Sequence, residues 1–141
     1  MHSQFEEYIG KRFSITLPED YFIEERSNKV YICKHSLRDI SFPRLQRRGL
    51  LAGKLWTLYG IKPSLDFALV FGHLAAKNYA VIDDDTVKSM YNGGRIESFE
   101  ECECADGIIL IKDKRGRGVG VALYVKGHLK PLIPKDRLAQ L

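Results

Sequence analysis

The last third of the chain concentrates basic side chains that are suited to contacting phosphate groups. Residues 112–141 contain eight Lys or Arg against two Asp or Glu, a local charge of +6. Each phosphate that such cations neutralise releases condensed counterions, so binding to a polyanion would weaken steeply with salt. The alternative is a solvated hairpin tip whose charges serve solubility. The candidate phosphate contacts are Lys112, Lys114, Arg115, Arg117, Lys126, Lys130, Lys135 and Arg137.

A second basic group surrounds the glycines that precede the main predicted helix. Residues 38–62 carry a charge of +5, whereas residues 63–111 carry −6, so two basic segments bracket an acidic one. This layout is typical of a nucleic-acid-binding surface. The cations of this group are Arg44, Arg47, Arg48, Lys54 and Lys62. The candidates for stacking on unpaired bases are Trp56, Tyr59 and Tyr124, although aromatic residues beside glycines are also common in a core.

Other patterns suggest catalysis or cofactor binding but lack the required spacing. Gly116, Gly118 and Gly120 alternate as in a nucleotide loop, yet they lead into a predicted strand, whereas the dinucleotide fingerprint opens a helix. No nucleophile and base, and no carboxylate pair, assemble in the sequence. We therefore predict that the protein is not an enzyme and binds no cofactor.

Cysteine and acidic residues raise the question of a metal site. Cys33 with His35, and Cys102 with Cys104, are each separated by one residue, whereas structural zinc sites use gaps of two to four. The acidic stretch 83–106 does not match the spacing of a calcium loop. We expect reduced thiols, helix capping by an Asp, and no metal.

The hydrophobic pattern predicts an α+β fold that positions the two basic segments. A main helix is expected to begin after Ser64, a good N-cap, with an apolar stripe that reaches Ala76. Asn92, Gly93 and Gly94 are expected to end a second, short helix at 86–91. A leading helix is expected around residues 5–9. The predicted strands are 13–17, 21–26, 29–34, 49–56, 95–99, 107–112, 118–125 and 128–133.

Length and composition predict one domain with a small extension in a reducing compartment. The 141 residues suggest a small N-terminal α/β unit at 1–40 and a main domain at 44–141. No apolar run approaches the ~20 residues that span a bilayer, and the N-terminus is unlike a signal peptide. The three cysteines, an odd number, argue against a disulfide scaffold. We expect a cytoplasmic protein.

Several short glycine-containing motifs resemble those of a known family. They are RGLLAGK (48–54), KPSLDFAL (62–69), YNGG (91–94), DGIIL (106–110), GVG (118–120) and GHLKPLIPK (127–135). Together with residues 5–35 they resemble the PUA-like region that follows the methyltransferase domain in Sun/Fmu-type (RsmF-like) RNA cytosine-5 methyltransferases. The resemblance implies a PUA-like mixed β-barrel with one main and one short helix, preceded by the small N-terminal unit, and it implies RNA binding. The chain lacks room for the S-adenosylmethionine-binding domain and lacks a Pro-Cys nucleophile, so the resemblance implies a stand-alone accessory domain without methyl transfer.

Two functional hypotheses follow. The first is a non-catalytic protein that recognises structured rRNA or tRNA, in ribosome biogenesis or RNA modification, and it predicts that residues 44–62 and 112–137 converge on one positive face. The second is a protein–protein adaptor that acts in trans with an RNA methyltransferase or ribosome assembly factor through the acidic 83–106 face.

Overall fold

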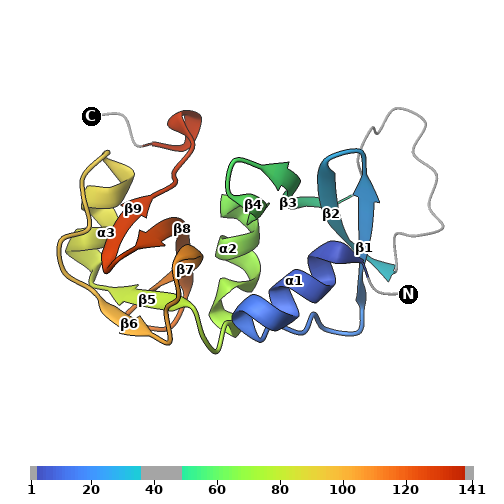
Figure 1. The fold of residues 1–141 in the computed structure, drawn as a ribbon, viewed down its shortest axis with the longest axis horizontal. Coiled ribbons are helices and arrows are strands. Elements are labelled where there is room, and N and C mark those ends of the chain that lie inside the picture. Colours follow the sequence, from blue (N-terminus) through green and yellow to red (C-terminus); the bar gives the residue numbers. More distant parts are fainter. Residues whose placement is uncertain (1–2, 36–48, 139–141) are drawn as a thin grey trace.

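The computed structural model describes residues 3–35 and 49–138, which form two sheets with a helix between them (Figure 1). The central helix is α2, Leu65–Phe71, which contacts β3 of the first sheet and β8 of the second. Helix α1, Gln4–Phe13, packs beside it, and α3, Asp84–Tyr91, lies at the far side of the second sheet. These elements confirm the expected α+β class.

Sheet A is an antiparallel meander of four strands in the order β1-β2-β3-β4. Its strands are β1 (Tyr21–Arg26), β2 (Lys29–Lys34), β3 (Leu50–Thr57) and β4 (Gly60–Pro63). The two-residue turn between β1 and β2 uses Ser27 at a φ of 54°, as a tight hairpin requires. The expected boundary between residues 40 and 44 falls between β2 and β3, so both predicted units contribute strands to one sheet.

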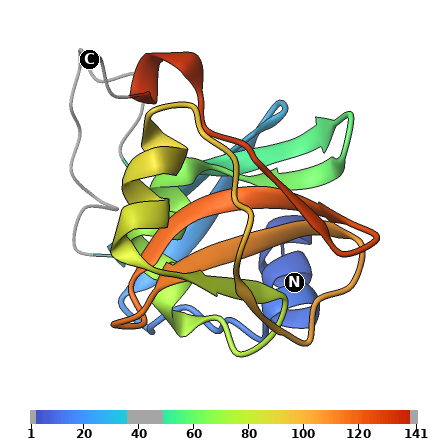
Figure 2. The same ribbon diagram turned by 90° about the vertical axis from the view of Figure 1, so that its left-hand side faces the viewer.

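Sheet B contains five strands in the order β6-β5-β7-β8-β9 and curls around its own core (Figure 2). Its strands are β5 (Tyr79–Ile82), β6 (Glu100–Cys102), β7 (Gly107–Asp113), β8 (Gly118–Val125) and β9 (His128–Pro131). Strands β5 and β7 are parallel, and α3 lies in the connection between them, whereas the other pairs are antiparallel. A parallel pair needs such a crossover.

Strand β7 separates two hydrophobic cores. Ile108 and Leu110 join the first core, with α1, α2 and sheet A, whereas Ile109 and Ile111 join the second, under α3. Because successive side chains of a strand point to opposite faces, a strand buried on both faces reads as a continuous apolar run. This explains the run GIILI at 107–111.

The caps of α2 and α3 agree with the prediction, the cap of α1 was not predicted, and one helix is shorter than expected. The side chains of Ser3, Ser64 and Asp83 each accept a hydrogen bond from a backbone N–H of the first turn of α1, α2 and α3. The predicted stripe to Ala76 is wrong for α2, which ends at Phe71 and continues as a 3₁₀ helix, Gly72–Leu74. This part of the chain packs tightly on β8, because a Cβ on Gly118 would clash with the carbonyl oxygen of Ala68.

Two predicted strands are wrong, and three short strands were not predicted. Residues 13–17 do not form a strand, because α1 extends to Phe13 and Ser14 caps it at a φ of 56°. Residues 95–99 are a connection in which Ile96 is buried in the second core, and pairing begins only at Glu100. Strands β4 and β5, of four residues each, and β6, of three, are too short to show a clear alternation. In residues 3–35 and 49–138, no helix combines the length and apolar character needed to cross a membrane.

Candidate nucleic-acid interface

Four basic residues form a row across the full width of sheet A. The register places Arg26 opposite Lys29, Lys29 opposite Lys54, and Lys54 opposite Lys62. Directly opposite residues of an antiparallel pair point to the same face, with Cβ atoms about 4.5–5.5 Å apart. We call Arg26, Lys29, Lys54 and Lys62 the basic row. It runs from β1 to the edge strand β4 and therefore presents closely spaced cations along one line.

The lysines of the basic row lack neutralising partners among the residues that the structure describes. The Nε atom of Arg26 lies 3.5 Å from a carboxylate oxygen of Glu24, and its guanidinium lies 4.9 Å from the centre of the Tyr31 ring. Lys29, Lys54 and Lys62 form no ion pair with any residue in 3–35 or 49–138. Like charges directly opposite one another destabilise a sheet. A bound polyanion would remove this repulsion.

An exposed tryptophan lies next to the row on the same strand. Trp56 is two residues from Lys54 on β3, and 72% of its surface is exposed. The amide of Asn28, in the β1–β2 turn, holds its backbone: Oδ1 accepts from the Trp56 N–H at 2.6 Å, and Nδ2 donates to the Trp56 carbonyl at 3.0 Å. A large exposed ring on a fixed backbone beside cations is the arrangement that stacks on nucleic-acid bases.

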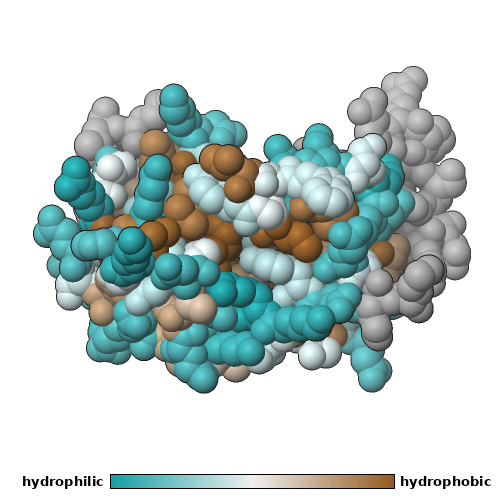
Figure 3. All heavy atoms as spheres, in the orientation of Figure 1, coloured by the Kyte–Doolittle hydropathy of each residue, from teal (hydrophilic) through white to brown (hydrophobic). Residues whose placement is uncertain are grey.

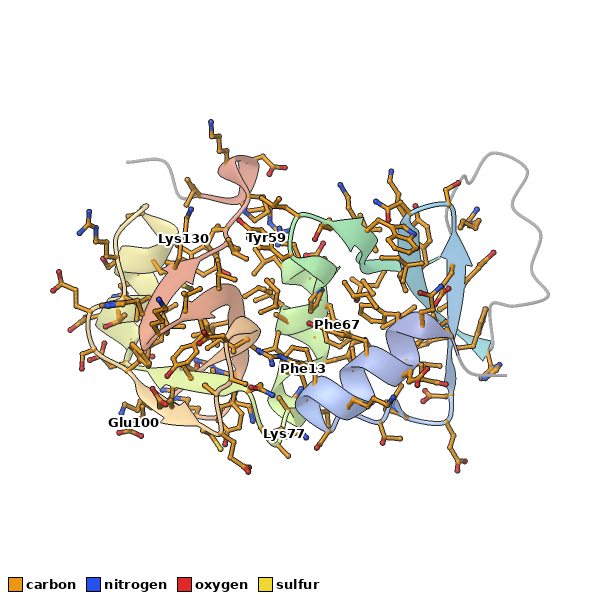
Figure 4. The ribbon with its side chains drawn as sticks, in the orientation of Figure 1. Phe13, Tyr59, Phe67, Lys77, Glu100 and Lys130 are labelled. Atoms are coloured by element: carbon orange, nitrogen blue, oxygen red, sulfur yellow. The ribbon has the colours of Figure 1, made fainter. Side chains whose placement is uncertain are left out.

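An open cavity of about 430 Å³ lies at the β4 edge of sheet A. It is bordered by the β3–β4 turn (58–59) and by the chain that follows β9 (132–138), which we call the C-terminal segment. Residues of both predicted basic segments line the cavity, Lys54 and Lys62 from the first and the apolar Leu132 and Pro134 from the second, so its cations within the described residues come from the first segment alone. Figure 3 shows apolar atoms that reach the surface at the β3–β4 turn, and Figure 4 shows Tyr59 at the same place. The other lining residues are Leu51, Gly53, Thr57, Leu58, Tyr59, Pro63, Ser64 and Leu65.

A second hollow, of about 700 Å³, lies on the other side of the same C-terminal segment. Pro131 and Ile133 line this second hollow, whereas Leu132 and Pro134 line the first cavity, as expected for an extended chain whose successive side chains point to opposite sides. The second hollow also has three basic side chains and one acidic one on its surface. They are Arg95, His128, Lys130 and Glu97.

The basic hairpin at 113–117 is largely neutralised by its own neighbours. Arg117 pairs with Asp113 at 2.7 Å, and Lys114 pairs with Glu100 at 3.1 Å. Burial of Asp113 favours a higher pKa, but hydrogen bonds from Arg117 and from the backbone N–H of Arg115 outweigh it and hold the pKa below its usual value. Arg115 forms no ion pair with another residue that the structure describes.

Lys112 is directed into the protein. Only 8% of its surface is exposed, and its ammonium group donates to the carbonyl oxygens of Ala75 at 2.7 Å and His73 at 3.2 Å. The group also lies 3.9 Å from the centre of the Tyr79 ring. Burial lowers the pKa of Lys112. This lysine joins the end of the 3₁₀ helix to sheet B and is not available to a phosphate.

The remaining predicted residues are divided between surface and core. Lys126, Lys130 and Lys135 are exposed. Arg137 pairs with Asp66 at 2.9 Å and so attaches the C-terminal segment to the start of α2. Arg44, Arg47 and Arg48 lie outside the described residues.

Tyr124, a predicted stacking residue, is buried. It is 8% exposed, and its hydroxyl donates to a carboxylate oxygen of Glu101 at 2.8 Å. This hydrogen bond is the main reason why the pKa of Tyr124 is raised to about 12. The ring packs in the second core, edge-on to Phe99, and offers no face to a base.

Sequence reasoning missed two members of the basic row. Arg26 and Lys29 flank the predicted β1–β2 turn, so their mutual pairing could be inferred from the hairpin. Their connection to Lys54 depends on the β2–β3 register, and residues 35–49 separate those strands in the sequence. No local pattern fixes that register.

Some carboxylates of the acidic segment 83–106 cap a helix or accept hydrogen bonds within the fold, and others are exposed. Asp83 caps α3, while Glu100 and Glu101 accept from Lys114 and Tyr124. Asp84, Asp85, Glu97 and Glu103 are exposed. Cys33, Cys102 and Cys104 are free thiols, and within the described ranges no group of three or more His, Cys, Asp or Glu side chains is arranged to hold a metal ion.

Comparison with protein-family models and with curated proteins found no match to this chain.

Proposed function

We propose that this protein is a non-catalytic RNA-binding protein with a PUA-like fold, which recognises structured rRNA or tRNA through the basic row. The observation that carries the proposal is the line of Lys29, Lys54 and Lys62 across sheet A, which no carboxylate within 3–35 and 49–138 neutralises. A sheet tolerates such a line at a cost in stability, and a phosphate backbone offsets that cost. The motifs that resemble the PUA-like region of RNA methyltransferases support the same function.

Exposed aromatic residues favour RNA over duplex DNA as the ligand. Trp56 and Tyr59 present ring surface beside the lysines, and bases stack on such rings only where they are unpaired. Structured RNAs expose unpaired bases in loops and bulges, whereas a DNA duplex exposes none. The proposed RNA therefore contains an unpaired region next to its helices.

The size of the row sets the expected salt dependence. The three lysines of the row, with Arg26 beside them, correspond to three or four phosphate contacts. Each contact with a single strand contributes about −0.7 to the slope of log K against log salt concentration, so the row predicts a slope of about −2 to −3. Arg115, Lys130 and Lys135 would steepen the slope if a larger RNA reached them.

The test is a salt titration of binding to a labelled tRNA pool and to rRNA fragments, beside a DNA duplex of equal length. We expect preference for RNA, and loss of most binding in the Lys54→Glu, Lys62→Glu double variant. The control is Lys77→Glu, because Lys77 lies past the far end of α2, on the opposite side of the view from Tyr59 (Figure 4). Equal binding to DNA, or equal loss in the control, would contradict the proposal.

The adaptor hypothesis keeps one supporting observation, the exposed carboxylates of Asp84, Asp85, Glu97 and Glu103. An adaptor would bring an RNA methyltransferase or ribosome assembly factor to its target through this acidic face. It predicts little RNA binding at physiological salt, so the same titration separates the two functions.

A further inference from the structure

The cavity at the β4 edge has features that phosphate binding alone does not need. Its walls are the β3–β4 turn on one side and Leu132 with Pro134 on the other, and its volume is about 430 Å³. Pockets for small ligands measure about 300–1,000 Å³ and combine apolar walls with a few polar groups. We propose that this cavity receives the base of one unpaired RNA nucleotide. This inference rests on the proposed function and specifies the part of the RNA that is recognised.

The β3–β4 turn forms a fixed wall for such a base. The Thr57 hydroxyl donates to the Gly60 carbonyl at 2.6 Å and accepts from the Tyr59 N–H at 3.0 Å, and Gly60 has a φ of +83° that favours glycine. The turn therefore holds Leu58 and Tyr59 outward, with Leu58 93% exposed. A wall that is ordered before binding loses little conformational entropy when a base packs against it.

The charges at the cavity match a nucleotide rather than an uncharged apolar molecule. Lys54 and Lys62 line the cavity, and its lining residues within the described chain include no Asp or Glu. Asp66, close by at the start of α2, is already paired with Arg137. An uncharged ligand would leave Lys54 opposite Lys62 without an anion, whereas the phosphate of a nucleotide neutralises that pair.

The nucleotide must be unpaired because its base has to leave a helical stack to reach Tyr59. In a duplex both faces of a base are covered by its neighbours, and only splayed bases stack on aromatic side chains. The basic row ends at Lys62, on the strand that borders the cavity. A backbone that follows the row therefore delivers its next base to the cavity.

The experiment uses the full chain and an RNA hairpin with one 2-aminopurine in its loop, whose fluorescence reports on stacking. A matched RNA has 2-aminopurine base-paired at the corresponding position of its stem. We expect a fluorescence change on binding only for the loop RNA. Tyr59→Ala should weaken binding of the loop RNA about 5- to 150-fold, the effect of one lost stacking contact. Tyr59→Phe, which keeps the ring, should restore it.

Salt dependence separates this site from general phosphate binding. Tyr59→Ala should leave the slope of log K against log salt unchanged, whereas Lys54→Gln should reduce its magnitude by about 0.7. RNA could bind without the fluorescence change, and Tyr59→Ala could bind it as tightly as the unchanged protein does. That result would overturn the base site and leave the proposed function standing. Absence of RNA binding would overturn both. If free nucleoside monophosphates saturate the cavity and RNA does not displace them, the cavity belongs to a free nucleotide and the proposal is overturned.

Discussion

Substituting Lys54 by Glu should make the fold more stable and RNA binding weaker. Lys54 is the only residue of the basic row, among the strands described, that lies opposite a lysine on both sides, Lys29 and Lys62. Both repulsive cross-strand pairs become attractive in this variant. We therefore expect opposite changes in the free energy of unfolding and in RNA affinity.

The size of the stabilisation follows from the number of pairs. A cross-strand charge pair is worth about 0.2–1 kcal/mol, and exposed pairs fall toward the lower end of that range. Reversing the sign of two pairs should raise the free energy of unfolding by about 1 kcal/mol at low salt. Lys54→Gln, which removes repulsion without adding attraction, should give about half of that gain.

Urea denaturation at low and high salt measures the effect without adding ions through the denaturant. The gain should shrink as salt rises, because the screening length falls from about 10 Å at 0.1 M to about 3 Å at 1 M. Lys77→Glu has the same charge change outside the row and should stay within about 0.5 kcal/mol of the unchanged protein. A Lys54→Glu protein that is no more stable than this control at low salt would refute the repulsion.

Two further predictions concern the packing between helix and sheet and the titration of a buried phenol. Gly118→Ala should destabilise the fold by about 1–3 kcal/mol, because the added Cβ meets backbone atoms of Ala68 and Gly72. Gly10→Ala, in α1 where the nearest atom is 3.9 Å away, should instead stabilise by about 1 kcal/mol, and both are measured by urea denaturation. Because the pKa of Tyr124 is raised to about 12 from its usual 10.0, its stabilising contribution is complete below pH 10 and is lost as pH rises through 12. Tyr124→Phe should remove one late-ionising tyrosine from the ultraviolet absorbance titration, and an unchanged late step would contradict the hydrogen bond to Glu101.

The sequence predicted those elements whose signal is local. Ser64 identified the start of α2, the helix predicted at 86–91 lies within α3, which begins two residues earlier at Asp84, and the apolar run at 118–125 matched β8. Strands β4, β5 and β6 were not predicted because three or four residues are too few to show a period. Residues 95–99 were misassigned because burial of Ile96 against the second core imitates the pattern of a strand.

The sequence predicted that the candidate site is rich in Lys and Arg, but not which of these residues lie together. The local charge predicted phosphate contacts at the hairpin 112–117. In the structure, Asp113 and Glu100 pair with two of its cations, and Lys112 is buried against the end of the 3₁₀ helix. Ion pairs between residues distant in sequence, such as Lys114 with Glu100, cannot be inferred from a local charge count. The basic row, in contrast, exists only because the register of sheet A aligns residues from four strands.

The placement of β7 between two cores has a consequence for how the protein can unfold. Alternate residues of this one strand fill different cores, so melting of either core exposes the apolar β7 side chains that pack in it. Sheet A packs on the first core, and the C-terminal segment extends from sheet B through β9. The cavity between them is therefore assembled only when both cores are intact. Partial unfolding of either half would disassemble the cavity, so the cavity persists only while both cores remain folded.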